Sequence, residues 1–192
     1  MATNNAVNTS LAGQTGTGTF VGATSPTLVT PVLGAASATS LSFSSTSGII
    51  GTTTNNNAAA GSVGQLISSV VTAASGITFT TNVAANVTSI SLTAGDWDVI
   101  GNVTFIPVLT TTRVYITDGW ISLTSATLPD QSLYASLPYV NTGFVSSTYI
   151  GFNVPSLRVS ISGTTTVYLS ILGAFDTSTL KACGGIYARR VR

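Results

Sequence analysis

The sequence predicts an all-β protein in which an extended N-terminal arm precedes an antiparallel β-sandwich or jelly-roll domain. Three observations lead to this prediction. Apolar residues in the C-terminal two thirds alternate with polar ones at a period of two, and turn residues separate these runs at roughly ten-residue spacing. The hydrophobic fraction is 44 %, which is enough for a core. Ser and Thr together make up 58 of the 192 residues, and they interrupt every long apolar run.

Charged residues are few and unevenly distributed. The chain has six Lys or Arg and five Asp, so 6 % of its residues are charged, against about 25 % in an average soluble domain. The first charged residue is Asp96, so the stretch from Met1 to Gly95 carries no charged side chain. The net charge of +1 excludes the basic surface that nucleic-acid binding requires.

The absent residue types exclude further classes of protein. Without His, imidazole-based catalytic triads and the common zinc sites cannot form. The lone Cys183 excludes an intrachain disulfide or a Cys-x-x-Cys site. No apolar run is long enough to span a bilayer, and residues 1–13 lack the basic start and apolar run of a secretory signal. We expect a protein that is not an enzyme, binds no metal or cofactor and does not insert into a membrane.

The composition changes near residue 60. Residues 1–60 are mainly Thr, Ser, Asn, Gly and Ala, whereas residues 61–192 contain both Trp, all six Tyr and all 11 charges. We therefore predict an arm over residues 1–60 and a sandwich over residues 61–192. The arm has too few apolar residues to offset the entropy of ordering its backbone, so we expect other copies of the chain or a larger assembly to order it.

Within residues 61–192 the strands are predicted from alternation. Trp97, Val99, Gly101, Val103 and Phe105 fall on one face of a strand, which Pro107 ends because it lacks an N–H. The other predicted strands are Ile90–Leu92, Arg113–Leu123, Ser132–Val140, Phe144–Phe152, Ser156–Ser162, Thr165–Phe175 and Leu180–Val191. Turns are expected at residues 141–143, 162–164 and 176–178.

Residues 62–74 are ambiguous. Their apolar residues fit a helical period, and Ser62 could cap a helix. The stretch is nevertheless rich in β-branched residues, contains Gly64 and has no charged pair. We favour a strand over a helix.

Asp96 and Asp98 flank Trp97 on the predicted strand. Two carboxylates on one face could bind Ca²⁺ or act as acid and base. We favour the simpler interpretation, in which the strand buries Trp97 and leaves both Asp side chains in solvent.

Aromatic side chains are the candidates for receptor binding, because their rings stack on the faces of sugars. The candidates are Trp120, Tyr134, Tyr139 and Tyr149. The alternative is that they are core or subunit-interface residues, as most aromatic residues of a sandwich are.

Three arginines, Arg189, Arg190 and Arg192, end the chain. We predict that they pair with carboxylates of neighbouring copies, since guanidinium groups suit such contacts. The alternative is that they bind an anionic partner.

Two stretches resemble fibre-type virion proteins of tailed bacteriophages. The first is GTGTFVGATSPTLVTPVLG over residues 16–34, and the second is NVTSISLTAGDWDVIGNVTF over residues 86–105, with the terminal IYARRVR over residues 186–192. Residues 94–99, AGDWDV, also resemble the strand entry of trimeric jelly rolls of the TNF/C1q type. The resemblance implies a homotrimer without catalytic residues. In its arm Phe20, Leu28 and Val32 are the candidate interface residues.

The resemblance implies a structural protein on the exterior of a phage particle. Its arm would anchor it to other virion proteins of the tail or capsid, and its head would attach to the host surface, with a glycan as the possible ligand. The alternative is a capsid decoration or head-fibre protein that binds no specific receptor.

Overall fold

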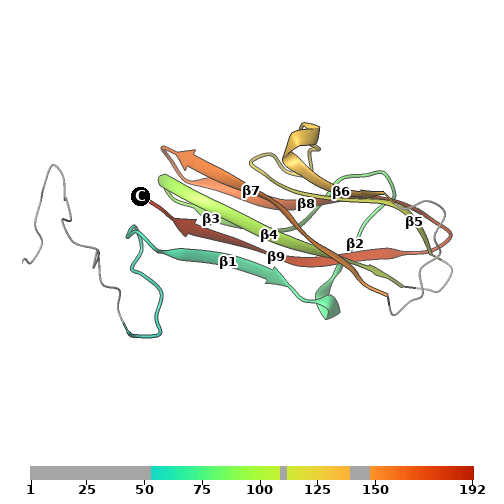
Figure 1. The fold of residues 1–192 in the computed structure, drawn as a ribbon, viewed down its shortest axis with the longest axis horizontal. Helices are drawn as coiled ribbons and strands as arrows, with labels where there is room; N and C mark the ends of the chain where they lie inside the picture. Colours follow the sequence, from blue (N-terminus) through green and yellow to red (C-terminus); the bar gives the residue numbers. More distant parts are fainter. Residues whose placement is uncertain (1–52, 109–111, 139–147) are drawn as a thin grey trace, which may run out of the picture. The chain divides into compact units, whose positions relative to one another are not determined.

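Nine strands and two short 3-10 helices form the described part of this computed structural model, which comprises residues 53–108, 112–138 and 148–192 (Figure 1). The helices are η1 (Ala73–Ser75) and η2 (Gln131–Leu133). The strands are β1 (Leu66–Val71), β2 (Ile77–Thr78), β3 (Ala85–Leu92), β4 (Gly95–Pro107), β5 (Arg113–Ser122), β6 (Tyr134–Pro138), β7 (Ile150–Ile161), β8 (Thr165–Asp176) and β9 (Leu180–Arg190).

The strands form two antiparallel sheets that face each other. Sheet A has the order β1-β9-β4-β7, with the short β2 also beside β9, and sheet B has the order β3-β8-β5-β6. The first and last strands of the domain are therefore hydrogen-bonded neighbours (Figure 1). Eight long strands in two facing sheets are the composition of a jelly roll, so the predicted all-β sandwich is confirmed.

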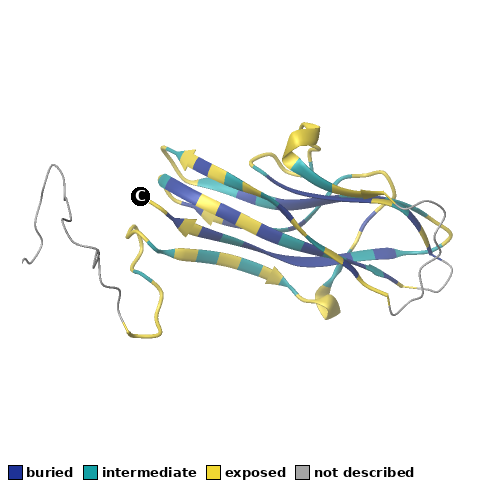
Figure 2. Cartoon of the chain, viewed as in Figure 1, coloured by how far each residue is buried: buried dark blue, intermediate teal, exposed yellow. Residues whose placement is uncertain are grey.

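The core lies between the sheets and is built from alternate residues of each strand. On β4, Trp97, Val99, Val103 and Phe105 are fully buried while Asp98 between them is exposed. Figure 2 shows buried and exposed residues alternating along this strand. Apolar residues of β8 meet the buried ones from sheet B. The face predicted for Trp97 is confirmed, because a strand with one buried face must place its apolar residues at a period of two.

The ambiguous segment 62–74 forms strand β1, with η1 directly after it. Its alternate residues point toward sheet B, and the others are exposed. β1 is an edge strand of sheet A, and the Asn57 side chain caps part of its free edge. Asn57 Oδ1 accepts a hydrogen bond from the Leu66 N–H, and Asn57 Nδ2 donates one to the Leu66 carbonyl, both at 2.8 Å.

One prediction of strand boundaries is wrong. A single strand, β7, replaces the last residues of the predicted Phe144–Phe152 strand and the separate Ser156–Ser162 strand. It passes through Pro155 because the register shifts there: Val99 pairs with Leu157 and Gly101 with Val154. Two residues of β7 then oppose one of β4, which is a bulge, and a bulge on an edge strand tolerates a missing N–H.

The strand predicted over Ser132–Val140 is shorter in the structure. Residues 131–133 form η2, whose N-cap Asp130 accepts a hydrogen bond from the Ser132 N–H at 3.0 Å, and β6 follows as Tyr134–Pro138. A cap of this kind starts a helical turn and delays the strand. The turn predicted at residues 141–143 lies outside the described residues.

Residues 1–52 of the predicted arm, and the predictions made for them, also lie outside the described residues. They include the interface candidates Phe20, Leu28 and Val32 and the motif at residues 16–34. The boundary predicted at residue 60 and the trimeric state stay predictions. In the part of the chain that the structure describes, no helix is long and apolar enough to cross a membrane.

Candidate functional site

The outer surface of sheet A is the candidate functional site. It consists of the side chains of β1, β9, β4 and β7 that point away from sheet B, and we call it the outer A face. Cross-strand register arranges them in rows. The rows are Leu66, Arg189, Asp98 and Arg158; then Ser68, Tyr187 and Ile100; then Val70, Gly185, Asn102 and Asn153.

Aliphatic side chains are exposed at the centre of the outer A face. Ile100 is 57 % exposed, Val70 56 % and Leu66 40 %. An open hollow of about 330 Å³ is lined by Leu66, Asp98, Ile100, Tyr187 and Arg189. A second hollow of about 240 Å³ shares Ile100 and Tyr187 with it. Exposed apolar residues that cluster beside a hollow are typical of a contact surface rather than of ordinary solvated sheet.

Gly185 determines how Tyr187 lies on this surface. A Cβ at Gly185 would come within 2.8 Å of the Tyr187 hydroxyl oxygen, so the phenol ring lies over the glycine. The ring therefore covers β9 instead of standing up from it. Because the ring lies flat on β9, the surface between the Ile100 and Val70 side chains is a shallow depression.

Charges of both signs border the apolar centre. Asp98 is opposite Arg189 on β9 and Arg158 on β7, and its charge contributes to raising the pKa of Arg158. The largest cause of that shift is the hydrogen bond between Arg158 and Asp96. The ion pairs found within 4.0 Å in the described residues join Asp96 to Arg158 and to Arg192. Asp98 and Arg189 take part in neither, and both are exposed.

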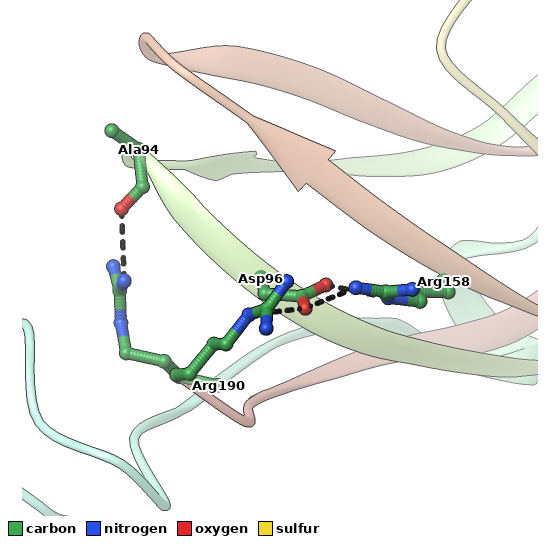
Figure 3. A network of polar contacts seen from close by, with 5 residues as sticks. Ala94, Asp96, Arg158 and Arg190 are labelled. Atoms are coloured by element: carbon green, nitrogen blue, oxygen red, sulfur yellow. Dashed lines mark hydrogen bonds and ion pairs between the residues drawn. The ribbon is translucent and has the colours of Figure 1, made fainter. Parts of the chain in front are cut away.

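Asp96 is buried, which corrects the prediction that both Asp side chains lie in solvent. Its carboxylate accepts two hydrogen bonds from Arg158, from Nε at 2.9 Å and from Nη2 at 2.6 Å (Figure 3). Arg192 Nε lies 3.0 Å from the same carboxylate. The hydrogen bonds from Arg158 lower the pKa of the Asp96 carboxyl from its usual 3.8. The two arginines shield Asp96 from water, so it is a structural ion pair and not a free acid.

Arg190 and Arg192 have partners within the chain, while the Arg192 side chain is still 74 % exposed. Their contact with neighbouring copies stays a prediction. Arg190 is only 5 % exposed. Its guanidinium donates hydrogen bonds to the Ala94 carbonyl (2.8 Å), Thr93 Oγ1 (2.6 Å) and Gln65 Oε1 (3.3 Å), as Figure 3 shows for Ala94. It also lies 4.3 Å from the centre of the Trp97 ring. Of the three predicted interface arginines, only Arg189 is exposed without such a partner in the described residues.

The outer surface of sheet B is covered at the level of Trp120. One row crosses all four strands and holds Asn86, Ser170, Trp120 and Tyr134. Asn86 fixes the segment after β5 on this row: its Oδ1 accepts a hydrogen bond from the Ala126 N–H at 2.8 Å, and its Nδ2 donates one to Ser125 Oγ at 2.7 Å. Trp120 is fully buried on this outer side and is not part of the core between the sheets.

Trp120 therefore cannot offer a free ring to a sugar, and its place among the receptor-binding candidates is corrected. Its ring packs edge-on against Tyr134 at 6.4 Å between centroids. Tyr134 is half-buried at the start of β6, and Tyr149 is 61 % exposed just before β7. Tyr134 and Tyr149 belong to different sheets, and no contact joins their rings among the described residues. Tyr139 lies outside those residues.

Asp118 lies on β5 in the row next to that of Trp120, on the outer side of sheet B, and its carboxyl group is buried. It lies between Leu172 on β8 and Ser136 on β6, and its Oδ1 has no hydrogen-bond partner among the described residues. Burial raises the pKa of the Asp118 carboxyl above its usual 3.8, while a hydrogen bond from Ser136 acts in the opposite direction. A carboxyl whose pKa is raised by folding favours the folded state at low pH, and this contribution is lost as the pH rises through its folded pKa.

Asp118→Asn should therefore stabilise the domain at pH 7, by about 1 kcal/mol, since it removes a buried charge that lacks a second partner. The gain should shrink as the pH falls toward 3.8, because wild-type Asp118 is then protonated and resembles Asn. Urea unfolding at pH 7 and pH 4 measures both differences in the free energy of unfolding. A variant that is less stable than wild type at pH 7 would show that the Asp118 charge is stabilised by partners.

In the described residues, no group of three or more His, Cys, Asp or Glu could hold a metal ion. Two further carboxylates have structural contacts. Asp176 Oδ2 accepts a hydrogen bond from the Tyr115 hydroxyl at 2.6 Å, and Asp130 caps η2. Among the described residues, the geometry thus offers a contact surface, the outer A face.

Fold and surface together define a two-sheet antiparallel β-sandwich domain whose outer A face is partly apolar and is not covered by any residue that the structure describes. No protein-family model and no curated protein matches the sequence. Among solved structures, the chain is similar to one in the structure of infectious bursal disease virus Gx strain, with 14 % identity and a TM-score of 0.41. The match covers 74 % of this chain and 36 % of that one.

Two further structures of infectious bursal disease virus are similar to the chain. The T13 viral particle gives 18 % identity and a TM-score of 0.40, over 74 % of this chain and 35 % of that one. The VP2 subviral particle gives 14 % and 0.33, over 67 % and 30 %. The chain thus spans about a third of the viral particle proteins it matches. These structures do not come from a tailed phage, so the resemblance to phage fibres stays a prediction.

The outer A face was not predicted from the sequence. The signal was Ile100, an aliphatic residue on the otherwise polar face of the Trp97 strand. It points to a contact surface only once β1 and β9 are known to place Leu66, Val70 and Tyr187 beside it.

Proposed function

We propose that the chain is a structural protein of a virus particle, in which identical copies assemble through the arm and display the β-sandwich on the particle exterior. The observation that carries this proposal is the distribution of charge. Residues 1–95 have no charged side chain, whereas the sandwich contains all 11. An uncharged arm lets identical chains lie together without repulsion between like charges, and its many hydroxyl and amide groups can bond between chains.

The proposal includes no catalytic activity. The chain has no His or Glu, and its single Lys181 and single Cys183 lie on β9. Burial raises the pKa of the Cys183 thiol, which disfavours the reactive thiolate. The motifs that resemble fibre-type virion proteins of tailed phages support the more specific role of an external fibre, and a homotrimer is the state that they imply.

Host attachment is the second part of the proposal, and exposed Tyr149 is the described residue that supports it. A weak sugar site repeated on each copy of an assembly gains affinity from multivalency. The test is a glycan array probed with the full chain and with Tyr149→Ala. Binding that Tyr149→Ala weakens would support attachment through this residue. Absence of binding would favour a decoration protein without a receptor.

Location on the particle tests the proposed function directly. Antibodies against the sandwich, applied to intact particles from cells that produce this chain, should label the outer surface in electron micrographs. Particles from which the chain has been deleted provide the control. If the chain sediments free of particles and no particle is labelled, the proposed virion role is wrong.

A further inference from the structure

Three parts of the described sandwich are poorly suited to pairing or packing with another protein. Asn57 caps the β1 edge at Leu66. A bulge at Pro155 interrupts the β7 edge. Bulges and blocked backbone groups discourage the addition of a further strand. The outer surface of sheet B is covered where Asn86 holds Ser125 and Ala126.

The outer A face is different, because its apolar centre is open. Leu66 and Val70 on β1 and Ile100 on β4 lie on either side of the flat ring of Tyr187 on β9. We infer that this face is a contact surface between copies of the chain, with Ile100 and Val70 of one copy buried against a second copy. This inference rests on the proposed assembly of identical copies and adds the surface through which the sandwiches meet.

The charges around the patch favour a second copy over other occupants. Asp98 and Arg189 are opposite each other on β4 and β9, and neither has an ion-pair partner within 4.0 Å in the described residues. A surface that carries both signs can match a rotated copy of itself, with Arg189 of one chain facing Asp98 of the other. An apolar centre with a charged border is also the usual anatomy of an interface between subunits.

Two other occupants fit less well. The residues before the sandwich carry no charged side chain, so the chain's own arm has no group to pair with Asp98 or Arg189. A sugar needs hydrogen-bonding groups and aromatic faces, whereas Ile100, Val70 and Leu66 offer only aliphatic surface. Both remain as outcomes of the test.

The test places a photo-crosslinker on the face of the full-length chain. Ile100→Cys is made in a Cys183→Ala background, labelled with benzophenone maleimide and irradiated. We expect a product of twice the chain mass, in which the linked peptide comes from β1, β4 or β9 of another copy. The control is Ile116→Cys, an apolar residue of β5 that is 37 % exposed on the outer side of sheet B. It should give no such product.

Other outcomes of the crosslinking overturn the inference. A link to residues 1–52 would mean that the arm occupies the face, and absence of any protein link would mean that the face is free. Equal linking from Ile116→Cys would mean non-specific collision. These crosslinking results concern only the outer A face. The proposed function is tested separately by antibody labelling of particles, so the two claims can fail independently.

A second measurement uses charge instead of a label. Ile100→Asp should weaken association of the full chain at least tenfold in sedimentation velocity, because an unpaired carboxylate would be buried between copies. Ile116→Asp should leave association unchanged. Equal association constants for Ile100→Asp and wild type would contradict the inference.

Discussion

Gly184→Ala should lower the free energy of unfolding by about 3 kcal/mol or more, or prevent folding. Gly184 faces the core on β9, opposite Val103 on β4, with φ at +155°. A Cβ there would overlap the carbonyl oxygen of Asn102 and lie 3.0 Å from the Cα of Val103. Both neighbours are backbone of the adjacent strand, so no side chain can rotate to make room. A loss of this size is a large share of the roughly 5–15 kcal/mol that stabilises a typical domain.

Gly163→Ala is the matched control. Gly163 lies in the turn between β7 and β8, and a Cβ there would meet no atom within 4 Å. Its free energy of unfolding should stay within about 0.5 kcal/mol of wild type. Urea unfolding followed by tryptophan fluorescence suits both variants, because Trp97 and Trp120 are buried in the native state. A Gly184→Ala protein as stable as the control would show that β9 and β4 can move apart at this point.

Arg190→Met should cost about 3 kcal/mol of unfolding free energy. Methionine keeps the length of the stem but leaves the Ala94 carbonyl and Thr93 Oγ1 without this donor. Gln65 Oε1 loses its bond from Arg190 and keeps the one from the Gly61 N–H. The substitution also removes the cation from the Trp97 ring. Arg190 itself is buried, and hydrogen bonds from a charged donor contribute about 1.5–3 kcal/mol each. Because Thr93 and Ala94 are exposed to water, the expected loss is smaller than the sum of these bonds.

Lys181→Met is the control for this substitution. Lys181 is on the same strand and half-buried on the opposite side of sheet A, and its side chain makes no hydrogen bond or ion pair within the described residues. Its stability should change by less than about 0.5 kcal/mol. If Arg190→Met were as stable as Lys181→Met, hydrophobic packing of methionine on Trp97 would suffice to hold the end of the sandwich.

Local pattern was enough to predict the strands that face the core. Trp97, Val99 and Phe105 recur at every second position, and only one face of a sandwich strand can bury them. The β-branched residues of the segment 62–74 likewise predicted a strand, although its apolar residues also fit a helix. In β1 the residues alternate between half-buried and exposed, because one face of the strand packs against the core.

The buried polar groups could not be predicted in the same way. Arg190 follows another arginine near the end of the chain, and this pattern is typical of charged side chains in solvent. Its burial depends on hydrogen bonds to Gln65 and Thr93, which lie more than 90 residues earlier. The alternation of residues along β5 places Trp120 on the face that points away from the core, where an exposed ring is expected. Its cover is fixed by hydrogen bonds to Asn86, which is distant in sequence.

The same limit applies to the candidate site. The outer A face joins residues of β1, β4 and β9, which are separated by up to 123 positions between Leu66 and Arg189. No local pattern contains that surface. The sequence predicted the tendency to assemble, from its uncharged first 95 residues, and the register of sheet A adds a specific surface on which copies can meet.

The central claim is that identical copies of this chain assemble, and the mass of the full-length chain in solution tests it most directly. Sedimentation velocity at micromolar concentration should give a single species of three times the 19.4 kDa chain mass. The Ile100→Asp variant should shift this species toward smaller masses, and the Ile116→Asp variant should not. A wild-type protein that sediments as a 19.4 kDa monomer at every concentration tested would contradict the account.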